Sequence, residues 1–101
     1  MQDNQIHVPP SFTELFLQPG KVKPSLPLAE ILQRYELCED MAQMLTDPAS
    51  ELLVKLGVTE ADVLHKMRLG LEADGTALSP AEALWVTCRL AELLNWPVPQ
   101  A

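Results

Sequence analysis

The chain has 101 residues, of which 48% are hydrophobic and 21% charged, and 14 acidic against 7 basic residues give a formal net charge of −7. This length suits one domain with its own core, while the acidic surface repels nucleic acid and anionic lipid. No apolar run approaches the roughly 18 residues of a membrane-spanning helix, so we expect a protein that binds neither nucleic acid nor membrane.

Residues 1–27 are predicted to form an extended arm that packs on the rest of the chain. No secretory signal is visible at its start, which favours a cytoplasmic location, and five of the nine prolines in the chain disfavour helix there. Ser11 and Glu14 match a capping box, so one short helix is expected at about 12–17. Phe12 and Phe16 lie one turn apart in it, and they would anchor the arm on its own body or dock it on another protein.

Two helices are predicted next, at about 28–45 and 48–56. Apolar residues recur at steps of three and four from Leu28 onward, which is the pattern of a long amphipathic helix. Its acidic cluster is expected on the solvated outer face: Glu36, Glu39 and Asp40. Asp47 is expected to end this helix and to cap the next one, with Pro48 in the first turn, and Gly57 ends the second helix.

A further helix is predicted to begin at Thr59, where Asp62 completes a capping pattern, and to end at Asp74. Apart from short extended pairings at 5–8 and 21–23, no segment shows strand alternation. The predicted class is therefore all-α, a compact bundle of four to five helices. Residues 28–96 form its body and residues 97–101 a disordered tail.

The last predicted helix, at 80–94, is apolar on nearly every side, so it needs cover from the other helices or from a partner. Only three charged residues interrupt it: Glu82, Arg89 and Glu92. Trp85 and Trp96 follow the same polar stripe, and the sequence leaves open whether they are exposed or covered. Either Trp85 shields the stem of Arg89 while the arm covers Trp96, or the two tryptophans form a contact site for another protein.

Residues 53–72 have the layout of a DNA-reading helix-turn-helix, with Gly57 in the turn. Leu53 stands where that motif prefers a small residue, and Glu60 and Asp62 would face the phosphates. Only three basic residues lie nearby: Lys55, Lys66 and Arg68. DNA binding draws much of its affinity from basic residues, so an ordinary corner between two helices explains Gly57 better.

The sequence lacks the common catalytic and metal-binding patterns. There is no G-x-S-x-G, no glycine-rich phosphate loop and no G-K-[ST], and a calcium loop around Asp74 would lack two ligands. Cys38 and Cys88 are expected as reduced, buried thiols, and their spacing from His65 is not that of a zinc site. His65 itself is expected to pack at a helix edge. We predict a protein that is not an enzyme and has no cofactor or metal.

Three stretches resemble a family of small uncharacterised proteobacterial proteins of about this length. They are V-P-P-S-F-x-x-L-F at 8–16, R-Y-E-L-C-E-D at 34–40 and R-L-A-E-L-L-N-W at 89–96. The likeness covers nearly the whole chain and implies a stand-alone bacterial cytoplasmic protein. Some such proteins carry a label of chaperone-type ATPase, but this chain has no nucleotide-binding loop to support that label, and the resemblance brings no catalytic residues.

Together these patterns predict a small acidic protein that acts through protein contacts, as an adaptor or a regulator. Its partner would be another protein or a second copy of the chain. The candidate contact residues are Phe12, Phe16, Tyr35, Trp85, Arg89 and Trp96. The alternative is a nucleic-acid-binding regulator that uses the helix-turn-helix-like segment.

Overall fold

The structure, a computed structural model, describes residues 7–17, 20, 23–73 and 75–99. All regular elements among these residues are helices, which confirms the all-α class. The chain divides into two compact units, residues 1–37 and 38–101, with the division falling inside helix α2 (Leu28–Met44). No helix among the described residues combines the length and the apolar character needed to cross a membrane.

The first unit begins with α1 (Pro10–Thr13), which continues into the short 3-10 helix η1 (Glu14–Phe16). The prediction of a helix capped by Ser11 is wrong, because Pro9 occupies the N-cap position and Pro10 the first turn. Proline suits that turn, since its φ is already helical and its missing N–H needs no partner. The buried Phe12 ring lies 5.5 Å from the ring of Phe16 and 5.7 Å from that of Tyr35 on α2, measured between centroids.

After η1 the chain folds back on itself within the first unit. The Ser25 amide donates to the Phe16 carbonyl at 2.6 Å, next to an isolated antiparallel bridge between Leu17 and Pro24. No strand is formed by the residues that the structure describes. The extended pairings predicted at 5–8 and 21–23 fall largely outside those residues.

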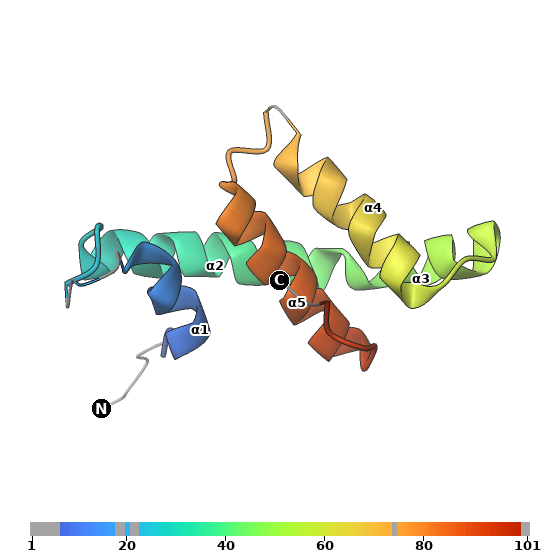
Figure 1. The fold of residues 1–101 in the computed structure, drawn as a ribbon, viewed down its shortest axis with the longest axis horizontal. Coiled ribbons are helices and arrows are strands. Elements are labelled where there is room, and N and C mark those ends of the chain that lie inside the picture. The colour runs from blue at the N-terminus through green and yellow to red at the C-terminus, as the bar shows by residue number, and fades with distance from the viewer. Residues whose placement is uncertain (1–6, 18–19, 21–22, 74, 100–101) are drawn as a thin grey trace. The chain divides into compact units, whose positions relative to one another are not determined.

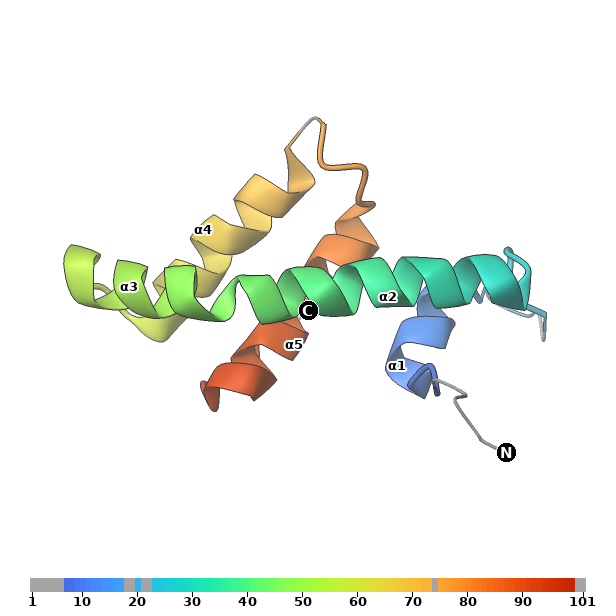
Figure 2. The same cartoon turned by 180° about the vertical axis from the view of Figure 1, so that it is seen from behind.

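Leu45 alone separates α2 from α3 (Thr46–Leu56), and the second half of α2 runs nearly in line with α3 (Figure 2). The prediction that Asp47 caps α3 is wrong. Leu45 stays close to helical geometry, with φ −89° and ψ −4°, so α3 begins before Asp47 is reached. Asp47 and Pro48 lie in the first turn instead, where a negative charge faces the positive end of the helix dipole and a proline lacks only an unused donor.

The corner between α3 and α4 (Glu60–Glu72) is built as predicted. Gly57 ends α3 in the left-handed region, with φ +64°, and its amide donates to the Leu53 carbonyl. Thr59 caps α4 through its hydroxyl, which accepts from the Asp62 amide at 3.1 Å, while the Asp62 carboxylate accepts from the Thr59 amide. A side-chain cap of this kind stabilises a helix by about 1 kcal/mol.

Helix α5 (Pro80–Leu94) has the predicted bounds and the predicted capping box between Ser79 and Glu82. It lies beside α4 (Figure 1). Leu90 joins residues of α3 and α4 in a buried cluster: Ala49, Val63, Leu64, Leu90 and Ala91. The chain itself therefore covers most of α5. Trp85 is only 9% exposed, so of the two alternatives for this side chain it is the covered one that the structure has.

Candidate functional site

The segment that follows α5 turns back along that helix. Asn95 ends α5 in the left-handed region, with φ +61°, and the Trp96 amide donates to the Ala91 carbonyl. This reversal brings the Pro99 carbonyl to 3.9 Å from the Sγ of Cys88, which donates to it. Residues 97–99 thus run beside α5. Of the predicted disordered tail, residues 100 and 101 lie outside the described ranges.

A pocket of about 390 Å³ lies between α4, α5 and residues 97–99. Helix α4 supplies one stripe of its surface, because residues spaced by three, four and seven positions share a helix face. Helix α5 supplies Thr87, and the returning segment forms the third wall. The lining residues are Ala61, Leu64, His65, Arg68, Thr87, Pro97, Val98 and Pro99.

Most of the lining is apolar, and its polar side chains are few. The Thr87 hydroxyl donates to the Ala83 carbonyl at 2.8 Å. Arg68 forms an ion pair with Glu72 through Nε, at 3.0 Å. His65, expected to pack at the edge of α4, is exposed and lines the pocket instead. The titratable side chains of the lining are therefore both basic types, in a chain of net charge −7.

Cys88 lies beside this segment, and its chemistry is that of a quiet thiol. Burial raises the pKa of Cys88, and the nearby Glu92 carboxylate raises it further, while Arg68 opposes them. Because the nucleophilic form of cysteine is the thiolate, a raised pKa keeps Cys88 unreactive at neutral pH. An un-ionised thiol also suits the role expected for Cys88, that of a small apolar side chain.

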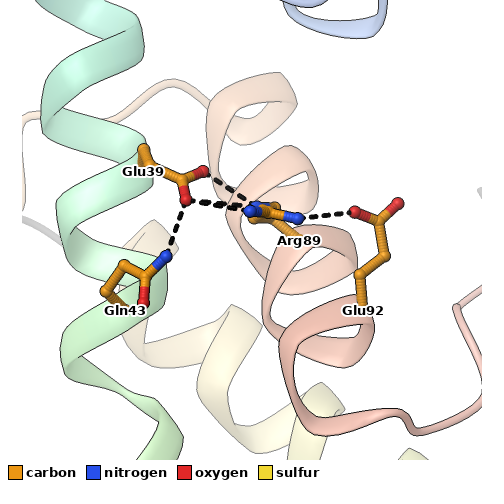
Figure 3. A network of polar contacts seen from close by, with 4 residues as sticks. All are labelled: Glu39, Gln43, Arg89 and Glu92. Atoms are coloured by element: carbon orange, nitrogen blue, oxygen red, sulfur yellow. Dashed lines mark hydrogen bonds and ion pairs between the residues drawn. The ribbon is translucent and has the colours of Figure 1, made fainter.

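A polar network joins the second half of α2 to α5 (Figure 3). Arg89 donates to both carboxylate oxygens of Glu39, with Nε at 2.9 Å from Oε1 and Nη2 at 3.1 Å from Oε2. Its Nη1 reaches Glu92 at 3.2 Å, and Gln43 donates to Glu39 at 2.8 Å. Glu39, expected on a solvated outer face, is instead the centre of this network.

The pKa values of the two central groups reflect their mutual contact. Burial alone would raise the pKa of Glu39, but hydrogen bonds from Arg89 and Gln43 bring it below its ordinary value. The hydrogen bond to Glu39 raises the pKa of Arg89, with Glu92 adding to the effect. Both groups therefore stay charged, and the pair acts as a bidentate clamp between two helices.

The predicted contact residues lie in several places. Phe12, Phe16 and Tyr35 form one aromatic cluster in the first unit. In the second unit, Trp96 packs against the buried cluster of α3, α4 and α5. Trp85 is nearly buried, and Arg89 pairs with Glu39 and Glu92. Internal contacts thus use much of their surface, and their role in binding another protein stays a prediction.

Large apolar side chains are exposed elsewhere on the second unit. Met44 at the end of α2 is 73% exposed, and Val54 on α3 is 84% exposed, with Leu56 also in solvent. We use the name apolar α2–α3 surface for these three exposed side chains taken together; Val54 and Leu56 are two residues apart and therefore point to different sides of α3. Periodicity could have indicated Val54, because it falls between the polar neighbours Glu51 and Lys55 on the outer side of α3.

No protein-family model, curated protein or solved structure matches this chain. The resemblance to small proteobacterial proteins therefore stays a prediction. What the molecule binds has to be inferred from its own side chains.

Proposed function

We propose that this protein is a small bacterial, cytoplasmic, non-enzymatic adaptor or regulator that acts by binding another protein or a second copy of itself. The observation that supports the proposal is the exposure of Met44 and Val54. Moving such a side chain from water into an apolar contact contributes about 1.5–3 kcal/mol. The folded chain leaves that contribution available to a partner.

The surroundings of Val54 have the character of a protein contact site. Glu51 and Lys55 flank it on α3, and both are exposed. An apolar centre with a polar rim is the usual anatomy of an interface between two proteins, because the rim keeps the free surface soluble. Helix α3, which presents these residues, is anchored to the core by the buried Ala49.

Light scattering combined with capture from a bacterial lysate tests this proposal. We expect either a dimer or a specifically retained protein, and we expect Met44→Gln together with Val54→Gln to weaken the association at least tenfold. Leu69→Gln is the matched control, because Leu69 is an exposed leucine on α4 outside the apolar α2–α3 surface. A strict monomer that retains nothing, or equal losses in the test and control variants, would contradict the proposal.

The second candidate is a nucleic-acid-binding regulator, and one observation favours it. Helix α3, the left-handed Gly57 and α4 follow one another in the order of a helix-turn-helix, and Val63 on α4 is buried. Against it, Glu60 and Asp62 stand in the first turn of α4, where the phosphates would lie.

A gel retardation series at increasing salt decides between the two candidates. For the nucleic-acid regulator, the chain would retard duplex DNA at low salt, and Lys66→Glu with Arg68→Glu would abolish the shift. We expect no retardation at physiological salt, because the net charge of −7 opposes phosphate binding.

A further inference from the structure

We propose that the pocket between α4, α5 and residues 97–99 binds a small apolar monocarboxylate, with its carboxylate at Arg68 and its hydrocarbon part along Ala61 and Leu64. This site is separate from the apolar α2–α3 surface. Its ligand would make the protein responsive to a metabolite in addition to binding a partner.

The size of the pocket fits a small molecule. Its volume of about 390 Å³ falls in the range of roughly 300–1,000 Å³ found for small-molecule sites, which are mostly apolar with a few placed polar groups. Three separate chain segments border this half-open pocket, whereas a flat docking surface would have one or two walls. These features favour a compact ligand over an extended protein segment.

The order of residues along α4 gives the ligand a direction. Ala61 and Arg68 are seven residues apart, which corresponds to about 10 Å along the helix axis. Ala61 and Leu64 form the apolar end of the stripe, and Arg68 stands at the other end. A hydrocarbon of about eight carbons with one terminal carboxylate spans that distance.

Charge decides the chemistry of the polar end. Neither an aspartate nor a glutamate lines the pocket among the described residues, while Arg68 and His65 do. Glu72 accepts a hydrogen bond from the Nε of Arg68, which leaves Nη1 and Nη2 to bind a ligand. Arginine binds carboxylates through paired N–H groups, so a carboxylate is the matching ligand. An amine would bring a like charge toward Arg68, and an uncharged molecule would leave its Nη groups without a carboxylate partner beyond the Glu72 contact at Nε.

Isothermal titration calorimetry with octanoate on the full chain tests the proposal, with 1-octanol and octylamine as probes that differ only in the head group. We expect saturable binding of octanoate, weakened about tenfold or more by Arg68→Gln, since a hydrogen bond to a charged group is lost. Lys66→Gln is the matched control, because Lys66 is an exposed base on α4 that does not line the pocket. Binding of 1-octanol as tight as that of octanoate would overturn the proposal.

Two further variants test the same pocket in case Arg68→Gln is poorly folded. Glu72→Gln releases the Nε of Arg68 and should tighten octanoate binding by a few fold. Ala61→Phe, at an exposed position, fills the apolar end and should abolish it. If neither variant changes the affinity, or if amide shifts on titration fall away from His65 and Val98, the pocket is not the site. If Ala61→Phe instead abolishes capture of a protein partner, the pocket belongs to that interface and the small-molecule proposal is wrong.

Discussion

At the scale of single residues, the negative charge of Glu39 in its ion pair with Arg89 matters for the stability of the fold. The pKa of Glu39 is lowered in the folded chain, chiefly by hydrogen bonds from Arg89 and Gln43 acting against burial. A carboxylate with a lowered folded pKa stabilises the native state above its ordinary pKa, and this contribution is lost as the pH falls through the folded pKa. The pair should therefore stabilise the protein at neutral pH and cease to do so in acid.

We expect Glu39→Gln to lower the free energy of unfolding by about 1–2 kcal/mol at neutral pH, because Arg89 loses a charged bidentate partner. Urea unfolding followed by circular dichroism measures this. The difference from the wild type should shrink as the pH is lowered below 4.5, the ordinary value for this carboxyl. Asp40→Asn, at an exposed acid one position along α2, should change the stability by less than about 0.5 kcal/mol. A difference that grows in acid would contradict this account.

At the scale of elements, substitutions at two glycines can separate the effect of backbone conformation on stability from the effect of steric clashes. Gly57 has φ +64° and Gly70 lies within α4, and a methyl group added at either would meet no atom within 4 Å. Gly57→Ala should destabilise the chain by about 1 kcal/mol, because only glycine adopts the left-handed region without strain. Gly70→Ala should stabilise it by about 0.5–1 kcal/mol, since alanine is the better helix former. Thermal unfolding of the two variants checks this, and shifts of the same sign would refute it.

The helix ends show which signals the sequence carries locally. The caps at Thr59 and Ser79 were predictable because each needs only a carboxylate three residues later, and both capping boxes are formed. Asp47 was assigned wrongly because a cap competes with simple continuation of the helix, and Leu45 continues it. A strong capping residue thus marks a helix start only where the preceding backbone has already left helical geometry.

At the scale of the whole molecule, the all-α class followed from composition and periodicity, and the site did not. The contact of Glu39 with Arg89 joins positions fifty residues apart, and no pattern within one helix can pair them. The pocket depends on the left-handed Asn95, which the sequence marks as a helix end without giving the direction of the chain afterwards. The sequence also predicts that nearly every side of α5 needs cover, but it does not say that this chain supplies most of it.

The return of residues 97–99 along α5 has one more consequence. Every helix described in the second unit ends before Pro97, so substitutions at residues 97–99 would change one wall of the pocket without altering a helix. The range of ligands that fit the pocket can therefore change through substitutions at residues 97–99 alone, while α4 and α5 keep the positions of the other two walls.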